Sequence, residues 1–304
     1  MSEKISEEKR MSLRKSWEVL FPYLLYYLAY NAAYLILAFA YQATVQSFGG
    51  AYGQFMTAHA ATVSGVMGGL CMLAGVLPLV PMFMRELRER GDAFDLTAGK
   101  EATGAGRLAV DVGSGAAAAA DSRENLRRKA GMSVLTVVLA LGASIGLNAL
   151  LALTGLADSS QTYREVADRQ YGVAFAVGLI LYGLISPLAE EVVFRGVIYN
   201  RLRRYYGKTA GIIASGLLFG VFHGNPVQGV YGACLGMMMA YLYEKSGDFR
   251  IPFLFHAAAN LAVYITARFP RAQEILFTPA GCAVLLAVSA GCLSIVWRGG
   301  KKRG

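Results

Sequence analysis

The chain has 304 residues, of which 55% are hydrophobic and only 16% are charged, and its mean hydropathy is +0.43. Soluble domains carry about 25% charged residues, so this composition excludes an ordinary water-soluble globular fold. The net charge is +9, but Lys and Arg stand beside the ends of apolar runs. They form no stripe interleaved with aromatic residues, which argues against a nucleic-acid partner.

Eight apolar runs follow one another along the chain, and each is expected to form a helix. A helix of about 20 apolar residues crosses a bilayer core, and a helix without a polar face has nothing to present to water. The runs therefore predict an all-α fold, a polytopic membrane helix bundle with about eight transmembrane helices. They cover residues 17–45, 62–84, 130–156, 171–189, 209–223, 227–243, 252–267 and 279–297.

The connections between these runs predict domain organisation and orientation. Residues 1–84 are expected to form a cytoplasmic N-terminus with two transmembrane helices, and residues 130–304 a six-helix membrane domain. Between them, residues 85–129 include a Gly-, Ala- and Asp-rich stretch that predicts a flexible cytoplasmic linker. Because Lys and Arg favour the cytoplasmic side of a membrane, the alternation of basic and uncharged connections predicts that both termini are cytoplasmic.

Small residues recur at helical spacing in two neighbouring runs. Glycines four residues apart place one small face on a helix, and small faces let helices approach closely in lipid. Two close-packed helices are therefore expected. Gly216, Gly220 and Gly224 recur every four residues, and Gly229, Gly232 and Gly236 follow on the next helix.

A few polar and ionisable side chains lie within the apolar runs or at their edges, where burial of charge is costly. Glu191 and Arg195 are four residues apart, with Glu first, the favourable order for an ion pair on one helix. His256 and Asn260 have the same spacing. Polar faces in lipid turn inward and meet. The expected pocket contains Glu190, Glu191, Arg195, His223, His256 and Asn260.

Hydrolysis by an activated water is the chemistry that this set of side chains can support. A carboxylate in a desolvated pocket can act as a general base. One His can share the water or donate to the leaving amine, while a second His and an Asn amide can donate to the developing oxyanion. No Ser or Cys stands in a nucleophile motif such as GxSxG.

Each residue also has a simpler interpretation. Glu191 and Arg195 fit a structural ion pair, which is the role we favour for them. Asn260 alone would serve to hydrogen-bond one helix to another. Two non-enzymatic functions stay open: a membrane immunity or scaffold protein, and a proton-coupled transporter with a Glu and His relay. The transporter is disfavoured because the sequence has no internal repeat.

The motifs in series resemble a known family. GluGluValValPheArg at 190–195 fits EExxxR, Phe219 to His223 fits FxxxH, and His256 to Asn260 fits HxxxN. Together they are similar to the CAAX-protease and bacteriocin-processing (CPBP or Abi) family of intramembrane endopeptidases. The resemblance covers residues 171–267, the expected catalytic core.

The resemblance implies a role for each motif residue. Glu190 would activate the water, and His223 would assist it. His256 and Asn260 would form the oxyanion site. The supporting residues would be Glu191, Arg195 and Phe219.

The resemblance leaves the cofactor open. The family is often labelled metalloprotease, and Glu190, His223 and His256 are the side chains that could ligate zinc. However, HExxH is absent. The resemblance to the prenyl-protein members favours a mechanism that requires no cofactor, and zinc is the alternative. The implied partners are the lipid bilayer and a membrane-held peptide or protein, either prenylated or a bacteriocin or signal peptide.

The depth of the site is the remaining question. The expected boundaries place Glu190 and His256 near the cytoplasmic ends of their helices, but His223 near the far end of its own. One solution is that the run at 209–223 begins later or tilts. The other is a break at the Ser186–Pro187 step, since proline restricts the residue before it.

Overall fold

The computed structural model describes residues 2–94 and 115–301, and within these ranges the chain forms helices and no strand. The all-α membrane bundle is confirmed, because several helices are long and apolar enough to cross a bilayer. The expected count of about eight spans is not confirmed. Five described helices qualify by length and composition: Arg10–Phe48, Ala60–Arg90, Leu126–Leu153, Phe175–Tyr206 and Pro279–Arg298.

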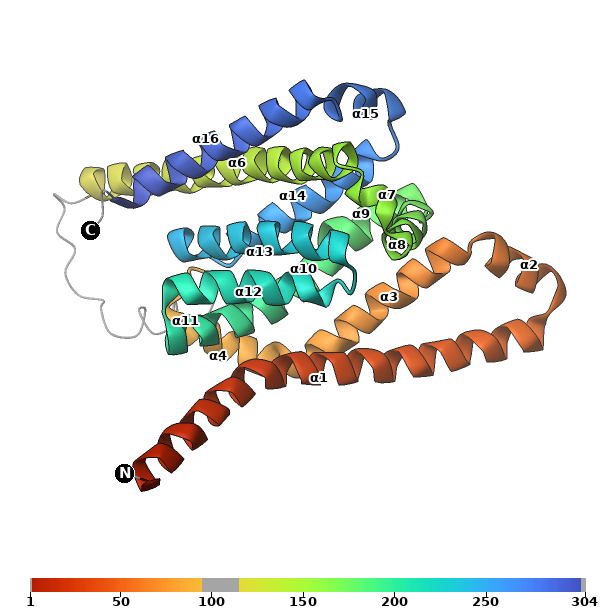
Figure 1. Cartoon of the computed structure of the whole chain (residues 1–304), viewed down its shortest axis with the longest axis horizontal. Coiled ribbons are helices and arrows are strands. Elements are labelled where there is room, and N and C mark those ends of the chain that lie inside the picture. Colours follow the sequence, from red (N-terminus) through yellow and green to blue (C-terminus); the bar gives the residue numbers. More distant parts are fainter. Residues whose placement is uncertain (1, 95–114, 302–304) are drawn as a thin grey trace.

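The N-terminal part is a helical hairpin in which α1 packs against α3 (Figure 1). A short helix, α2, turns the chain between them at one end of the molecule. The elements are α1 (Ser2–Phe48), α2 (Gly50–Ala58), α3 (Ala60–Val76), the 3-10 turn η1 (Leu77–Leu79) and α4 (Val80–Arg90).

The segment expected to be a linker, residues 85–129, is partly helical. Its first residues belong to α4, and its last belong to α6 (Gly115–Leu153). After α4, the carboxylate of Asp92 is buried and accepts a hydrogen bond from the backbone N–H of Phe249, at 3.1 Å. This contact holds the end of α4 against the C-terminal half. Residues 95–114 lie outside the described part of the chain.

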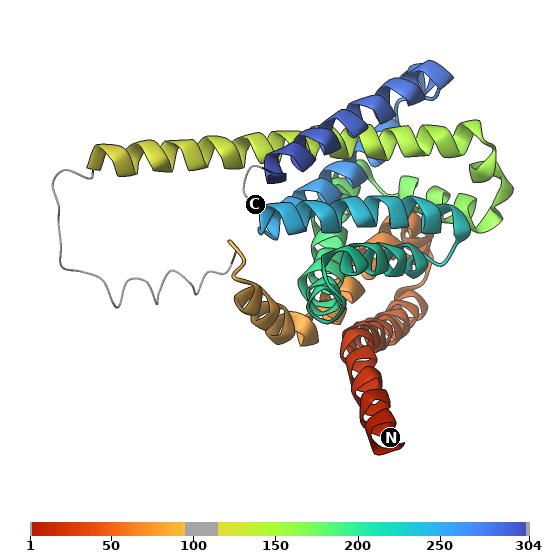
Figure 2. The same ribbon diagram turned by 60° about the vertical axis from the view of Figure 1, so that its left-hand side comes forward.

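The C-terminal part forms the rest of the bundle. Helix α16 packs along α6, α14 packs on the other side of α6, and α12 packs against α13 (Figures 1 and 2). The elements after α6 are α7 (Leu156–Ser159), α8 (Gln161–Tyr171), α9 (Phe175–Ile180), η2 (Leu181–Ile185), α10 (Ser186–Glu191), η3 (Val192–Tyr199), α11 (Asn200–Tyr206), α12 (Lys208–Phe222), α13 (Pro226–Ser246), α14 (Arg250–Thr266), α15 (Pro270–Leu276) and α16 (Pro279–Lys301).

Elements α9 to α11 form one continuous helix, so the break considered at Ser186–Pro187 does not occur. Ser186 keeps helical dihedrals (φ −61°, ψ −51°), and Pro187 stands in the first turn of α10. Two π-helical stretches, η2 and η3, flank α10 and shift its register. π-helical turns of this kind are frequent at functional sites.

Because this helix is continuous, Glu190 and His223 can be compared in their depth within the bundle. Glu190 lies sixteen residues before the end of its helix at Tyr206, and His223 lies fifteen residues after the start of α12 at Lys208. The two side chains therefore reach a similar depth in the bundle. The expectation that Glu190 lies near a helix end was wrong, because the helix continues well beyond the apolar run at 171–189.

The glycine faces of α12 and α13 bring these helices into close contact, as expected. A Cβ atom built on Gly220 would lie 2.3 Å from the carbonyl oxygen of Gly229, and one on Gly236 would lie 3.0 Å from the Cα of Gly216. No larger residue fits at these positions without moving backbone. Gly224 differs: its φ of +71° forms the turn between the two helices.

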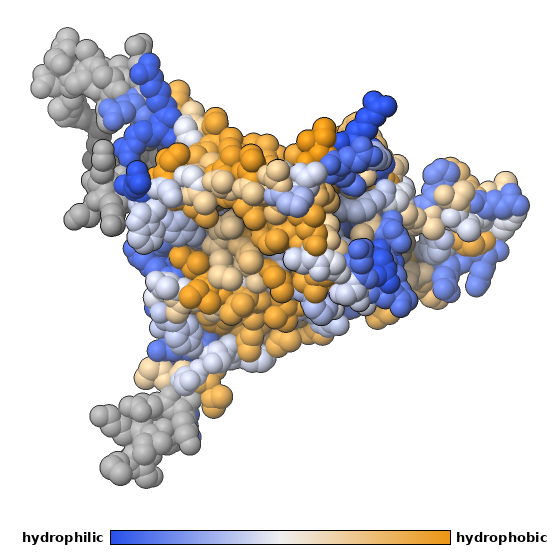
Figure 3. Space-filling view, turned by 45° about the horizontal axis from the view of Figure 1, so that its top comes forward, coloured by the Kyte–Doolittle hydropathy of each residue, from blue (hydrophilic) through white to orange (hydrophobic). Residues whose placement is uncertain are grey.

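An apolar surface lies between two hydrophilic ends of the molecule (Figure 3). Soluble proteins rarely expose a contiguous apolar face of this kind. Many large apolar side chains on the outside are more than half exposed, which fits contact with lipid. Examples are Leu35, Phe39, Val221, Val284 and Ile295.

Helix α1 begins and α16 ends at the same end of the bundle, where α4 and α11 also lie (Figure 1). We call this the basic end. Helices α7, α8 and α15 lie at the opposite end (Figure 1). The cations of the basic end include Arg85, Arg88, Arg90, Arg203, Arg204 and Lys208.

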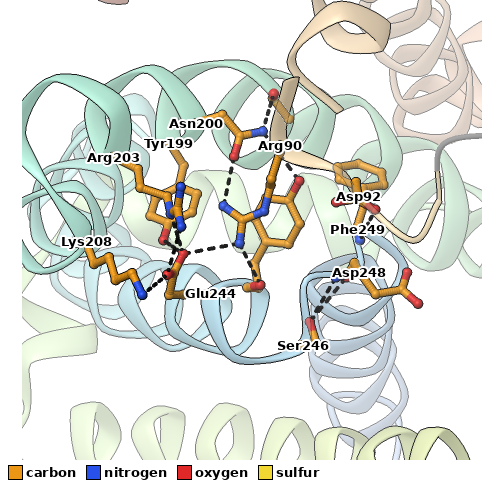
Figure 4. Close-up of polar contacts among 12 residues, drawn as sticks. Arg90, Asp92, Tyr199, Asn200, Arg203, Lys208, Glu244, Ser246, Asp248 and Phe249 are labelled. Carbon is orange, nitrogen blue, oxygen red and sulfur yellow. Dashed lines mark hydrogen bonds and ion pairs between the residues drawn. The ribbon is translucent and has the colours of Figure 1, made fainter. Parts of the chain in front are cut away.

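Glu244 at the end of α13 ties together several helices of the basic end (Figure 4). Its Oε2 accepts hydrogen bonds from Arg203 Nε at 2.7 Å and Tyr199 OH at 2.8 Å. Arg90 Nη2 also donates to Oε2, at 3.2 Å, and Lys208 Nζ lies 3.1 Å from Oε1. We call these five residues the Glu244 cluster. Since they come from α4, η3, α11, α12 and α13, the cluster fastens α4 to the bundle.

Candidate active site

Glu190 lies on α10 with only 7% of its surface exposed. The hydroxyl of Ser186, one helical turn earlier, donates to Glu190 Oε1 at 2.6 Å. The other oxygen, Oε2, is buried and has no hydrogen-bond partner among the described residues. A buried carboxylate oxygen left unpaired is costly, so it marks a place where water or a ligand is expected.

Glu191 and Arg195 are both completely buried and form the ion pair expected from their spacing. Arg195 Nη1 donates to Glu191 Oε1 at 2.7 Å, and Nη2 donates to the carbonyl of Gly236 at 3.0 Å. The guanidinium also lies over the ring of Phe219, 4.5 Å from its centroid. These contacts lock η3 against α12 and α13.

His256 joins the two glutamates. Its Nδ1 lies 2.8 Å from Glu191 Oε1, and its Nε2 lies 3.8 Å from Glu190 Oε2. An ionised carboxylate can only accept a hydrogen bond, so Nδ1 is the donor to Glu191 and Nε2 is the nitrogen on the Glu190 side. Glu191 therefore fixes the orientation of the imidazole.

His223 stands directly after α12 and is half-buried. Its Nδ1 lies 2.8 Å from the carbonyl oxygen of Phe219, and its ring meets the Phe219 ring edge-on at 4.9 Å. Behind it, a Cβ on Gly232 would lie 3.2 Å from Nδ1. The carbonyl and the glycine together hold the ring in place.

Asn260 lies one turn after His256 on α14 and is half-buried. Its side-chain amide makes no hydrogen bond to any described residue, and it lines the same cavity as Glu190. An unpaired amide at this position is free to bind a ligand.

One cavity of about 350 Å³ brings together the four residues expected to be catalytic, Glu190, His223, His256 and Asn260. The three residues expected to support them, Glu191, Arg195 and Phe219, do not line the cavity and pack behind it. The pocket expected at the sequence level therefore divides into a lining group and a buried group.

The zinc alternative is not matched by the donor arrangement. Among the residues that the structure describes, no group of three or more His, Cys, Asp or Glu side chains is placed to hold a metal ion. The candidate ligands Glu190, His223 and His256 thus form no such group. The four cysteines, Cys71, Cys234, Cys282 and Cys292, are free.

The sequence did not reveal two features of the site. Ser186 bonds to Glu190, and its spacing of four residues from Glu190 was a signal that could have identified it. The second is the wall of the cavity, which α3 and α8 supply with residues such as Gly68 and Tyr163. No motif marks these residues, because they contact the site only through the tertiary fold.

Comparison with known proteins finds a family match over the part of the chain that holds the candidate site. Residues 172–262 match the family model for type II CAAX prenyl endopeptidase Rce1-like proteins. The resemblance to the CAAX-protease family is confirmed. The Rce1-like segment runs from just before α9 into α14 and holds all seven site residues that the sequence predicted. The described helices before α9 lie outside it.

A curated relative supports the match. The Bacillus subtilis (strain 168) protein named "Putative membrane peptidase YdiL" is 31% identical over 115 residues, which are 36% of this chain and 45% of the relative. The chain thus spans less than half the length of that relative. No solved structure matches significantly.

Proposed function

We propose that the protein is an intramembrane endopeptidase that cleaves a membrane-held peptide or protein with a water activated by Glu190. The observation that carries this proposal is Glu190 Oε2, which has no hydrogen-bond partner among the described residues and lies 3.8 Å from His256 Nε2. Both residues line the cavity. That separation is too long for a direct hydrogen bond, and such gaps between polar groups suit a bridging water. The Rce1-like match and the peptidase name of the relative support the same activity.

The reaction that we propose is direct attack by water. Glu190, held by Ser186, takes a proton from water as the new C–O bond forms on the peptide carbonyl. His256 in its imidazolium form and the Asn260 amide donate to the developing oxyanion. The C–N bond then breaks, and the proton that Glu190 took from water passes by way of His223 to the leaving amine, which returns Glu190 to its starting state.

Glu191 and Arg195 act in this scheme as positioning residues. Neither lines the cavity, but Glu191 bonds to His256 Nδ1 and Arg195 bonds to Glu191. The pair therefore aims Nε2 of His256 toward the reacting carbonyl. A catalytic ring held by a buried carboxylate loses little orientational freedom when substrate binds.

We further propose that catalysis needs no metal ion. The absence of a three-ligand group among the described residues supports this. Dialysis of the purified protein against EDTA and 1,10-phenanthroline should leave peptide cleavage within about twofold of the untreated rate. Loss of activity that added Zn²⁺ restores would contradict the proposal.

The orientation that we propose places both termini in the cytoplasm, because Lys and Arg favour that side and gather at the basic end where α1 begins and α16 ends. The substrate classes that fit are a prenylated protein and a bacteriocin or signal peptide. Both are held at the membrane.

The proposed function is tested by comparing protein termini in membranes from cells that make wild type or Glu190→Gln at matched levels. New peptide ends that occur only with wild type are expected, and they would also identify substrates. If both membranes give the same ends while both proteins are folded, the peptidase proposal fails. A non-catalytic immunity or scaffold role would then take its place.

A further inference from the structure

We infer that the candidate active site opens toward the end of the bundle opposite the basic end, so that the protein cleaves a peptide segment exposed on the extracytoplasmic side of the membrane. The inference rests on the proposed peptidase function and on the orientation proposed with it. An exported peptide, such as a leader or signal segment, then fits as the substrate, whereas a protein anchored at the cytoplasmic face does not.

The cavity that holds Glu190 is lined by the halves of the helices that lie away from the basic end. Helix α14 begins at the basic end, where Phe249 bonds to Asp92, and its lining residues start only at His256. Helix α13 reaches the basic end with Glu244, and only its first turns line the cavity. None of the described residues of α4 and α11 lines it. Further lining residues are Asn148 and Leu151 of α6, His223 after α12, and Gln228 and Tyr231 of α13.

One face of α14 carries the open space away from the basic end. His256, Asn260 and Val263 line the cavity with Glu190, and Val263 also lines a second cavity of about 200 Å³. The second cavity continues to Thr266 near the end of α14 and to Gln273 of α15, which lies at the opposite end (Figure 1). Because the two cavities share lining residues, they adjoin. The shared residues are Asn148, Tyr163, Ala167, Tyr171 and Val263.

Packing closes the way from Glu190 to the basic end. Every residue from Ala189 to Leu202 is buried, so the helix that carries Glu190 is enclosed over this whole length. Beyond it, the Glu244 cluster fastens α4, α11, α12 and α13 to one another. A substrate arriving from the basic end would have to displace this packing.

Polar side chains line the cavity along the path to the opposite end. Polar residues within a membrane bundle face its interior or a water-filled cavity, so this lining favours a path that holds water. Arg169 of α8 has 74% of its side chain exposed and also lines the cavity, which therefore reaches the surface there. Apolar residues such as Leu181 share the walls, so a peptide can contact both kinds of surface. The polar lining residues outside the motifs are Ser64, Asn148, Arg169, Gln170 and Gln228.

The distribution of cations assigns this opening to the extracytoplasmic side. Lys and Arg favour the cytoplasmic side, and most of them gather at the basic end. In the described chain, the connections at the opposite end contain four cations: Arg164, Arg169, Arg268 and Arg271. Helix α8, with a half-buried face and an exposed charged face, is typical of a helix that lies at a membrane surface.

The test labels single cysteines from each side of the membrane. Cys234 is the only one of the four free cysteines that is partly exposed, so Cys234→Ala is the background. Ser64→Cys places a thiol at the mouth of the cavity, and Ser186→Cys places one beside Glu190. A charged, membrane-impermeant methanethiosulfonate should label both at least about tenfold faster in right-side-out than in inside-out vesicles, because charge is excluded from the hydrocarbon core.

Three controls accompany these variants. Arg88→Cys, on the exposed face of α4 at the basic end, should label fast only in inside-out vesicles. Ser289→Cys matches Ser186→Cys, but Ser289 is buried on α16 away from the cavity, so it should label from neither side. Cys234→Ala alone should not label. Gln228→Cys supplies a second thiol in the cavity if Ser186→Cys does not fold.

Labelling needs no catalysis, so two failures are distinguishable. If wild type and Glu190→Gln give the same peptide ends, the peptidase proposal fails and the inference with it. If wild type cleaves but Ser186→Cys and Gln228→Cys label faster in inside-out vesicles, the peptidase stands and the inference is wrong. Labelling of Ser64→Cys and Arg88→Cys from the same side would also overturn it, as would wild-type peptide ends confined to cytoplasmic segments.

Discussion

Glu244 and Glu190 are both buried acidic residues, yet their surroundings differ. Glu244 receives four donors, from Arg90, Tyr199, Arg203 and Lys208, and both of its oxygens are paired. Glu190 receives one donor among the described residues, on one oxygen, while its other oxygen has no hydrogen-bond partner there and lies 3.8 Å from His256 Nε2. The Glu244 cluster lines no part of the cavity, while Glu190 does.

This difference separates a structural role from a functional one. Fully paired buried polar groups make a fold specific and rigid. An unpaired buried group costs stability and persists where function requires it. Glu191 is intermediate: its Oε1 bonds to both Arg195 and His256, while its Oε2 has no partner among the described residues.

Loss of the Glu191 charge should have the largest effect on stability. In Glu191→Gln the buried Arg195 charge loses its partner, and breaking a buried ion pair costs about 3–5 kcal/mol. The melting temperature of the purified protein should fall strongly, and cleavage should fall as His256 loses its orientation. If Glu191→Gln melts like wild type, the Glu191–Arg195 ion pair does not stabilise the fold.

A double variant sharpens this prediction. Replacing both partners, as in Glu191→Gln with Arg195→Met, leaves no unpaired charge. The loss of stability in the double variant should therefore be smaller than the sum of the losses in the two single variants. Additive losses would show that the two side chains do not interact energetically.

Glu244→Gln should separate stability from activity. Hydrogen bonds to charged groups are worth about 1.5–3 kcal/mol, so thermal unfolding should report a loss of that order. The cleavage rate of the folded protein should stay within about twofold of wild type. A loss of cleavage that exceeds the loss of folded protein would mean that the basic end takes part in the reaction.

Ser186→Ala should weaken catalysis moderately by freeing Glu190. Loss of one hydrogen bond, about 1 kcal/mol, corresponds to roughly a fivefold fall in kcat with little change in KM. Ser186→Thr keeps the hydroxyl and should recover most of the rate. Ser289→Ala is the control, since the Ser289 hydroxyl donates only to the Leu285 carbonyl on α16, away from the cavity. Equal effects of the two alanine variants would exclude a positioning role for Ser186.

The smallest effect is expected at Asp248, in the connection between α13 and α14. Burial raises the pKa of this carboxyl, but hydrogen bonds from Arg250, at 2.6–2.8 Å, outweigh it and hold the pKa below its usual value. The ion pair therefore stabilises the fold above about pH 4, and this contribution is lost as the pH falls below it. Such a partly exposed pair is worth about 0.2–1 kcal/mol.

Melting temperatures at pH 7 and pH 3 test this prediction. Between pH 7 and pH 3, the melting temperature of wild type should fall slightly more than that of Asp248→Asn, which lacks the titrating group. The reverse order would show that the Asp248 carboxylate does not stabilise the fold.

Spacing in the sequence predicted much of the site, because helical geometry fixes which residues share a face. The pairs Glu191–Arg195 and His256–Asn260 needed only the four-residue rule, and the glycines of α12 and α13 followed the same logic. The contact of Glu191 with His256 joins residues on different helices and depends on how α10 packs on α14. Local pattern cannot supply such a contact.

Two further features lay beyond local pattern. The helix at 175–206 contains π-helical turns around Pro187 that no residue preference predicts. It also continues to Tyr206, beyond the apolar run, and this continuation sets the depth of Glu190. The wall formed by α3 and α8 contributes small and aromatic residues of kinds found in any membrane helix. They became candidates only when the fold placed them opposite Glu190.

The most direct test of the account measures peptide cleavage and melting temperature for purified wild type, Glu190→Gln and Glu244→Gln. A general base contributes about 10²–10⁴-fold to rate. Glu190→Gln should therefore lose cleavage by at least about a hundredfold and melt like wild type, while Glu244→Gln should melt earlier and still cleave. Cleavage by Glu190→Gln at the wild-type rate would contradict the account.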